Sequence, residues 1–145
     1  MSAPDIPFNR EKPTPSGEVI RLAPLVRRVL AGNAGPFTFT GTCTYIVGEG
    51  KVAVIDPGPA DEAHIDALLA ATKGETISTI LVTHTHRDHS PAARALKEWT
   101  GAKTYGFGPH GKGRIEGGIV VEEGGDMDFL PDVAVRDGDV IDAAG

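Results

Sequence analysis

Cysteine is almost absent from this sequence, because Cys43 is the only one in 145 residues. A single cysteine cannot form a disulfide within the chain, so the disulfide framework of small secreted domains is excluded. The first residues also lack the basic segment and apolar core of a secretory signal peptide. We therefore expect a cytoplasmic protein.

Long apolar runs and an excess of basic residues are missing as well. The chain is 40% hydrophobic with a mean hydropathy of -0.11, and it contains no run long enough for a membrane span. A net charge of -6 argues against a broad nucleic-acid surface, although a local basic patch around Lys112 and Arg114 stays open. These features fit one ordinary domain without membrane contact. They leave a small-molecule and a nucleic-acid substrate both open.

Histidine is also scarce, yet three of the five histidines fall within one stretch of six residues, His84-Thr85-His86-Arg87-Asp88-His89. Neutral imidazole and carboxylate groups together are ligands for zinc (Zn), and they also suit iron or manganese. The alternative is a solvated turn that happens to be rich in histidine. The concentration of histidine beside an aspartate favours the metal site.

The flanks of this stretch predict where it lies in the fold. The β-branched segment 76–82 predicts a strand covered on both faces, and Ser90-Pro91 predicts an N-cap and the first position of a helix. At the end of a strand, side chains alternate, so His84, His86 and Asp88 can converge while His89 is aimed separately. The sequence therefore predicts a strand-to-helix loop that can serve two adjacent ions.

The pattern His84-x-His86-x-Asp88-His89, with Thr83 before it and Ser90 after it, resembles the HxHxDH signature of the metallo-β-lactamase superfamily. The resemblance implies a metal-dependent hydrolase, in which a hydroxide held between two zinc ions attacks an ester, thioester, amide or phosphodiester. His84 and His86 would hold the first ion, and Asp88 with His89 the second. Asp88 would also be catalytic, because it could orient the hydroxide or pass a proton to the leaving group.

Two further segments carry the resemblance. Residues 41–48 are similar to the superfamily's second strand, with Cys43 where many relatives have Asn; Cys43 itself reads as a small buried filler. Asp56, directly after the predicted strand 51–55, reads by itself as a turn carboxylate. In the resemblance, Asp56 supports the metal loop by hydrogen bonding and is not usually a direct ligand.

The rest of the chain predicts an α/β (α+β) fold with a mostly antiparallel or mixed sheet and two helices. We expect a proline-rich extended arm at 1–17 and a domain at 18–145. Apolar and β-branched patterns predict strands at 19–22, 25–30, 37–47, 51–55, 76–82 and 103–107, and a hairpin of 133–136 with 140–141. The second strand should turn its arginines toward water.

Helical periodicity predicts one helix at 59–73 and another at 91–100. His64 on the first helix reads as an exposed or packing histidine. The second helix should turn Ala95, Leu96 and Trp99 inward. Glycine and charged residues predict a mobile loop at 108–128, with His110 at the surface or on the substrate side.

The superfamily fold is a four-layer αββα sandwich of two similar halves, and the resemblance runs from about Val19 to the last residue. The family's third histidine, bridging aspartate and last histidine follow downstream, whereas no histidine follows His110 here. We therefore expect the N-terminal half of the sandwich, truncated before the third-histidine motif and poorly active alone. Its uncovered sheet face should drive self-association or pairing with a complementing chain.

Three readings of the function stay open. The metal loop and residues 41–48 look most like the β-lactamase-like hydrolases that often carry a winged-helix tail. A glyoxalase-II-like thioesterase shares the same metal motif. A non-catalytic binding or assembly module, in which the metal loop is vestigial or structural, belongs to a different class.

Overall fold

Seven strands form one mixed sheet, in which each strand lies beside the next strand of the chain. The structure, a computed structural model, describes residue 11, residues 14–112 and residues 124–144. The mixed sheet with two helices that the sequence predicts is confirmed. The elements in chain order are β1 (Val19–Ala23), β2 (Val26–Leu30), β3 (Cys43–Glu49), β4 (Lys51–Ile55), α1 (Glu62–Ala71), β5 (Thr76–Leu81), α2 (Ala92–Thr100), β6 (Lys103–Gly106) and β7 (Val133–Ala134).

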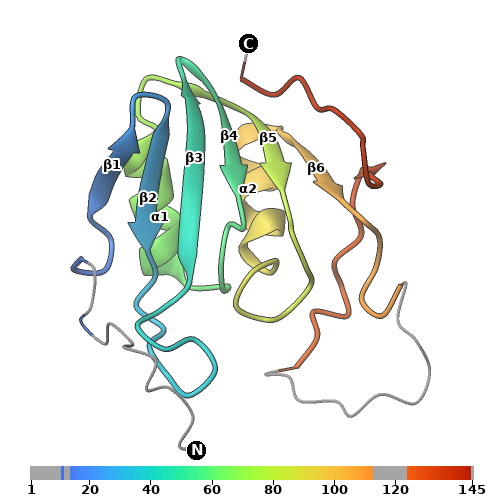
Figure 1. The fold of residues 1–145 in the computed structure, drawn as a ribbon, viewed down its shortest axis with the longest axis horizontal. Coiled ribbons are helices and arrows are strands. Elements are labelled where there is room, and N and C mark those ends of the chain that lie inside the picture. Colours follow the sequence, from blue (N-terminus) through green and yellow to red (C-terminus); the bar gives the residue numbers. More distant parts are fainter. Residues whose placement is uncertain (1–10, 12–13, 113–123, 145) are drawn as a thin grey trace, which may run out of the picture.

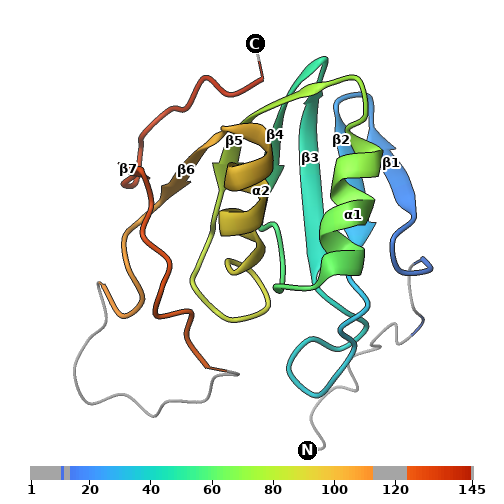
Figure 2. The same ribbon diagram turned by 180° about the vertical axis from the view of Figure 1, so that it is seen from behind.

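The sheet changes from antiparallel to parallel at β4. Strands β1 to β4 pair antiparallel, and β4 to β7 pair parallel. A parallel pair needs a crossover connection, which α1 supplies between β4 and β5 and α2 between β5 and β6. Both helices cover the same face of the sheet, as Figure 2 shows. The loops that follow β4 and β5 therefore leave the sheet at the same end, where the metal motif lies.

The core lies between the sheet and these two helices. Leu68 of α1 and Leu96 of α2 are fully buried. Burial of each such side chain contributes about 1.5–3 kcal/mol to folding. The core cluster consists of Val29, Ile46, Val52, Val54, Leu68, Ile77, Ile80, Val82, Ala93, Leu96, Ala102 and Phe129.

The opposite face of the sheet carries no helix in the part of the chain that the structure describes (Figure 1). One row of paired residues crosses this face from β2 to β6, and all of its members are half-buried. The row consists of Arg28, Tyr45, Ile55, Leu81 and Tyr105. Apart from Arg28, this half-buried row is aromatic or aliphatic, and the partner expected to cover the face stays a prediction.

The predicted strand at 37–47 begins later than expected, because β3 starts at Cys43. Asn33 closes the preceding segment into a loop: its Oδ1 accepts from the Thr42 amide at 2.9 Å, and its Nδ2 donates to Thr42 Oγ1 at 3.0 Å. Phe39 within this loop has a φ of 55°, which is incompatible with a strand. Cys43 is half-buried, so the expectation of a buried filler is only partly met.

The prediction that both arginines of β2 face water is wrong for Arg27. Adjacent residues of a strand point to opposite faces, so Arg27 and Arg28 cannot both turn the same way. The Arg27 side chain is only 12% exposed, and it donates to Glu75 at 2.8 and 3.0 Å and to the Ala71 carbonyl at 3.0 Å. Its hydrogen bond holds the pKa of Glu75 below the ordinary value.

Two predictions in the second half of the chain are also wrong. Trp99 is 75% exposed, since the buried stripe of α2 runs through Ala92, Ala93 and Leu96 and leaves Trp99 at its margin. The expected hairpin is a turn without a second strand. The Arg136 amide donates to Asp139 and closes the turn, but Val140 beyond it is 95% exposed and pairs with no strand that the structure describes.

Some predictions concern residues that the structure does not describe. Most of the extended arm at 1–17 lies outside the described residues; near its end, the Gly17 amide donates to the Leu30 carbonyl at 2.9 Å. The predicted mobile loop at 108–128 includes residues 113–123, which also lie outside them. Among the described residues, no helix has the length and apolar character that crossing a membrane requires.

Candidate metal centre

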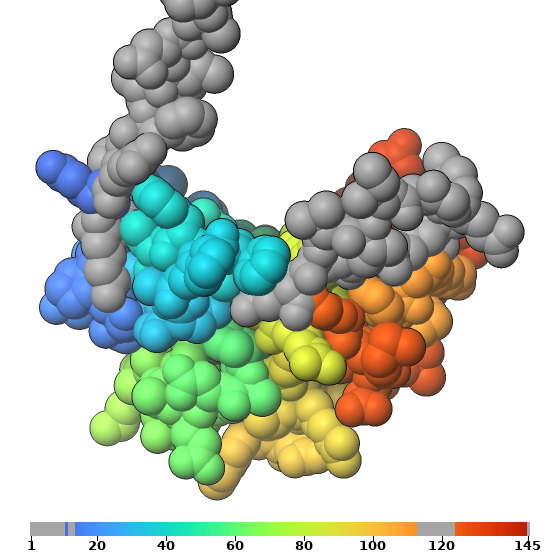
Figure 3. Space-filling model, turned by 90° about the horizontal axis from the view of Figure 1, so that it is seen from below, coloured from blue at the N-terminus to red at the C-terminus, as the bar shows by residue number. Residues whose placement is uncertain are grey.

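The metal loop, residues 83–90, connects β5 to α2 at the carboxyl ends of the parallel strands. Asp56, which follows β4, lies at the same end, because its amide donates to the Leu81 carbonyl at 2.8 Å. Seen from below in Figure 3, the yellow surface of the metal loop lies between the cyan loop 31–42 and the orange segment that begins at Gly124. The metal loop is thus flanked by two other loops at this end of the sheet.

The carboxylate of Asp56 holds both ends of the metal loop. Its Oδ1 accepts from the Thr83 amide at 2.8 Å, and its Oδ2 accepts from Thr83 Oγ1 at 2.6 Å and from His89 Nδ1 at 3.0 Å. Burial by itself would raise the pKa of Asp56, but the hydrogen bonds from His89 and Thr83 outweigh burial and hold the pKa below its ordinary value. Asp56 therefore stays ionised, as the predicted supporting role requires.

The tautomer of His84 follows from its neighbour. Thr83 Oγ1 has one proton, which it donates to Asp56, so the hydroxyl can only accept from His84 Nδ1 at 3.0 Å. The Nε2 atom of His84 then carries the lone pair that binds a metal. Burial lowers the pKa of His84, and the neighbouring His89 and His86 lower it further, which favours the neutral form that ligates.

His89 lies between two carboxylates. Its Nδ1 donates to Asp56, and its Nε2 lies 3.1 Å from Asp88 Oδ2. Asp88 is 8% exposed, and its Oδ2 also accepts from Thr42 Oγ1 at 3.0 Å. An imidazole nitrogen and a carboxylate oxygen that face each other need a proton or a cation between them.

The structure brings the three imidazoles of the motif together. The ring of His84 lies 4.6 Å from that of His86 and 4.0 Å from that of His89, measured between centroids. The donor atoms of Asp56, His84 and His89 all lie within 4.8 Å of one another, which forms the one such group among the described residues. Asp56, predicted as a support, is therefore also within reach of an ion. Ligation by His84, His86, Asp88 and His89 stays a prediction.

This arrangement fits zinc on the chemistry of its donors. Zinc takes neutral imidazole nitrogen and ionised carboxylate oxygen, and His84 and Asp56 are in those states here. Asp56 also fixes the ring of His89 through Nδ1, the hydrogen bond that metal-binding histidines commonly make to a carboxylate.

The segment after Gly124 lies against the metal loop, which the sequence did not indicate. The Arg87 amide donates to the Gly124 carbonyl at 3.2 Å, and the Asp126 amide donates to the Thr85 carbonyl at 2.8 Å. The Ser90 hydroxyl donates to Asp126 Oδ2 at 2.6 Å, so Ser90 does not cap α2 with its side chain as predicted. His110 lies beside the loop too, since its Nδ1 is 2.9 Å from Thr85 Oγ1.

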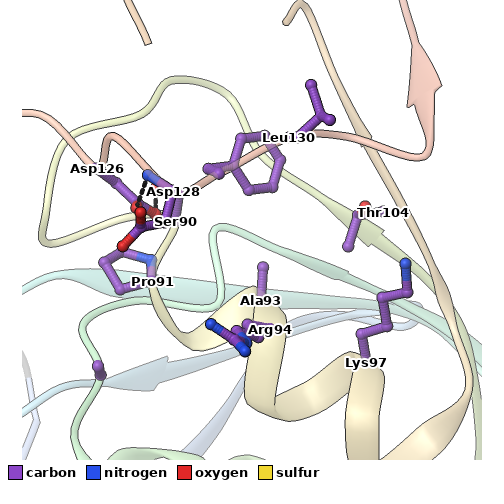
Figure 4. Close-up of a pocket in the computed structure, with 11 residues that line it drawn as sticks. Ser90, Pro91, Ala93, Arg94, Lys97, Thr104, Asp126, Asp128 and Leu130 are labelled. Carbon is purple, nitrogen blue, oxygen red and sulfur yellow. Dashed lines mark hydrogen bonds between the residues drawn. The ribbon is translucent and has the colours of Figure 1, made fainter. Parts of the chain in front are cut away.

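A pocket of about 390 Å³ lies on the other side of Ser90, between α2 and the segment 126–130. Figure 4 shows Arg94 and Lys97 of α2 on one side of it and Asp128 and Leu130 on the other. None of the motif histidines lines this pocket. Of the metal loop, only Ser90 lines the pocket.

The comparisons with known proteins agree with this geometry. A family model described as "Metallo-beta-lactamase superfamily" matches residues 37–144. The chain belongs to the metallo-β-lactamase superfamily.

Curated relatives match a part of this chain. An "Atrochrysone carboxyl ACP thioesterase" of Passalora fulva is 41% identical over 76 residues, which are 50% of this chain and 23% of the relative. A protein of the same name from Aspergillus chevalieri is 43% identical over 79 residues, which are 52% of this chain and 26% of the relative. The matches thus span about a quarter of these relatives.

Solved structures share the fold. A subclass B3 metallo-β-lactamase of Bradyrhizobium japonicum superposes with a TM-score of 0.61 at 23% identity, over 92% of this chain and 51% of that structure. The metallo-β-lactamase GOB-18 from Elizabethkingia meningoseptica gives a TM-score of 0.60 at 20% identity, over 99% of this chain and 54% of that structure. The sheet and two helices therefore correspond to about half of these folds.

Proposed function

We propose that this chain supplies the metal-binding end of a metal-dependent hydrolase that cleaves acyl thioesters. The observation that carries the proposal is the convergence of Asp56, His84 and His89, whose donor atoms lie within 4.8 Å of one another. Asp88 beside them adds an ionisable oxygen 3.1 Å from His89 Nε2. A solvated turn would not bury two carboxylates around one imidazole, because burial of a charged group costs free energy.

The residues of the metal loop would have separate roles. His84, His86, Asp88 and His89 would hold zinc, with two ions in the complete domain, and iron or manganese suits the same donors. When bound, the metal supplies Lewis-acid chemistry, which lowers the pKa of a water molecule and polarises the bond to be cleaved. Asp56 keeps His89 in the tautomer with Nδ1 protonated.

We propose that Asp88 transfers the proton in the reaction. Thr42 donates to its Oδ2 at 3.0 Å, which fixes the carboxylate at the edge of the imidazole cluster. From there Oδ2 would orient the attacking water, accept its proton and pass that proton to the leaving thiolate.

The thioester is proposed because of what the relatives are named. Both fungal proteins compared above are called ACP thioesterases, and they are more than 40% identical to this chain where they align. The metallo-β-lactamase structures are below 25% identical, so they support the fold alone. A glyoxalase-II-like enzyme is one form of the same thioesterase chemistry.

Metal content of the purified chain is the first test. We expect zinc by elemental analysis after dialysis against micromolar zinc, and loss of that zinc in His84→Ala and His86→Ala. Lys73→Ala, in the turn after α1, serves as a control that should keep the metal. A wild-type chain without zinc, or zinc that survives both substitutions, would contradict the proposal.

The substrate class needs a second assay. Zinc-loaded protein is compared on an acyl-pantetheine thioester and on a chromogenic cephalosporin, each with and without a chelator. Because the chain is expected to be poorly active alone, we expect slow, chelator-sensitive hydrolysis of the thioester that still exceeds hydrolysis of the cephalosporin. Hydrolysis of neither compound by a zinc-loaded chain would instead favour a binding or assembly module.

A further inference from the structure

His64 is a histidine outside the metal motif that the proposed chemistry does not use. It lies on α1, is only 2% exposed, and its Nε2 lies 2.8 Å from Thr44 Oγ1 on β3. Thr44 is fully buried, and the same hydroxyl lies 2.7 Å from the Asp56 carbonyl oxygen. Three elements, α1, β3 and the end of β4, thus meet through one hydroxyl group.

The direction of these hydrogen bonds follows from the single proton of the hydroxyl. The Asp56 carbonyl can only accept, so Thr44 donates to it and His64 Nε2–H donates to Thr44. The Nδ1 atom of His64 is then unprotonated; it is buried and has no hydrogen-bond partner. Burial also lowers the pKa of His64, which keeps the ring neutral. The order of donation is therefore His64 to Thr44 to Asp56.

Asp56 is a residue whose backbone needs such support. Its φ is 51°, in the left-handed region that is costly for a residue with a side chain. The carboxylate of Asp56 grips Thr83 and His89, as described above. If Asp56 relaxed by rotation about its N–Cα bond to a negative φ, its carbonyl and its carboxylate would both move, and the carboxylate would leave Thr83 and His89. A hydrogen bond that fixes the Asp56 carbonyl therefore fixes the metal loop as well.

We propose that His64 is a positioning residue for the metal centre, which acts through Thr44 on the left-handed Asp56 and so on His89. The inference rests on the proposed metal-binding function. A histidine that merely fills the core would tolerate any apolar side chain of similar volume. A positioning histidine requires a donor where its Nε2 lies.

The test compares variants that keep the donor with variants that remove it. His64→Gln places an amide N–H within reach of Thr44, and Thr44→Ser keeps the hydroxyl. His64→Leu removes the N–H donor and Thr44→Val removes the hydroxyl, each with a side chain of similar volume. Leu68→Ala, one turn along α1 and fully buried, disturbs the same packing without touching the hydrogen bonds. Zinc affinity is measured by competition with a chromophoric chelator, and stability by urea unfolding.

We expect His64→Leu and Thr44→Val to lower zinc affinity by about tenfold or more, the effect of losing an outer support of a metal ligand. His64→Gln and Thr44→Ser should stay within about threefold of the wild type, and so should Leu68→Ala although it is less stable. Wild-type affinity in His64→Leu overturns the inference. An affinity loss that follows stability across all variants, Leu68→Ala included, overturns it too.

A second readout in metal-free protein separates this inference from the proposed function. Nitrogen-15 NMR detects the His64 Nε2 proton, the His89 Nδ1 proton and the Thr83 amide. We expect His64→Leu to shift the signals of the His89 Nδ1 proton and the Thr83 amide. Leu68→Ala should leave both signals unchanged. If the wild type binds no zinc, the proposed function fails and these spectra decide the positioning role. Unchanged His89 and Thr83 signals in His64→Leu overturn that role.

Discussion

The Nε2 atom of His89 lies 3.1 Å from Oδ2 of Asp88. The ring cannot turn away to relieve this contact, because its other nitrogen donates to Asp56. The Thr42 hydroxyl donates to the same oxygen of Asp88 and holds it in place. The pair is therefore positioned to hold a proton or a metal cation between its two atoms, and the charge of Asp88 should decide how tightly a metal is held.

Removal of the negative charge of Asp88 tests whether that charge contributes to metal affinity. Asp88→Asn keeps the shape of the side chain and an acceptor for Thr42, and we expect zinc affinity to fall by about tenfold or more. Chelator competition measures the change. Asp66→Asn makes the same charge change at an exposed position of α1 and should bind zinc like the wild type. Equal affinities of the two variants would show that Asp88 does not contact the metal.

The stability of the metal-free chain should depend on pH through His64. Burial lowers its pKa below the ordinary 6.5, so the unfolded chain binds a proton that the folded chain rejects. The stabilising contribution is present above pH 6.5 and is lost as the pH falls toward the lowered pKa. We expect the unfolding free energy to fall on acidification through this window, and to fall less in His64→Gln. Urea unfolding at several pH values measures it, and parallel curves would refute the prediction.

Gly58 should be intolerant of a side chain because of His64. Its φ is 94°, and an added Cβ would lie 2.8 Å from His64 Cδ2. Gly74 has a similar φ of 83° but no atom within 4 Å of that position. We expect Gly74→Ala to cost about 1–2 kcal/mol of unfolding free energy for the backbone alone, and Gly58→Ala about 1–3 kcal/mol more. Urea unfolding compares them; equal costs would mean that His64 yields to the new methyl group.

The open face of the sheet should be where the chain associates. Ile55 lies in the middle of the half-buried row, with Tyr45 on one side and Leu81 on the other. We expect wild-type protein to sediment as an oligomer at micromolar concentration, and Ile55→Lys to sediment as a monomer. Trp99→Lys changes an exposed residue of α2 and should leave the oligomer intact. A monomeric wild type would contradict the prediction.

Sequence patterns located most of the fold because apolar periodicity, β-branched runs and the glycines and prolines between them are local signals. The errors occur where tertiary contacts override local preference. Arg27 reads as a polar strand residue, but Glu75, distant in the sequence, draws it against α1. Phe37 and Phe39 favour a strand, but Asn33 closes them into a loop through Thr42. A pairing between distant residues leaves no local signal.

The candidate site also contains residues that the sequence predicts and residues that only the fold reveals. His84, His86, Asp88 and His89 are close in sequence, so their clustering follows from one loop. The residues that orient them come from elsewhere in the chain. Thr42 precedes β3 and His64 lies on α1, and neither belongs to a motif that suggests its role. Their roles depend on which hydroxyl donates to which oxygen, and only the assembled fold defines that.

The order of strands in the sheet has a consequence for synthesis on the ribosome. Every strand pairs with the one that precedes it in the chain, from β1 to β7. Each strand that leaves the exit tunnel therefore finds its partner already present, and no early strand must wait for a late one. The sheet can extend by one strand at a time, and the metal loop leaves the tunnel only after β4, the strand against which β5 adds.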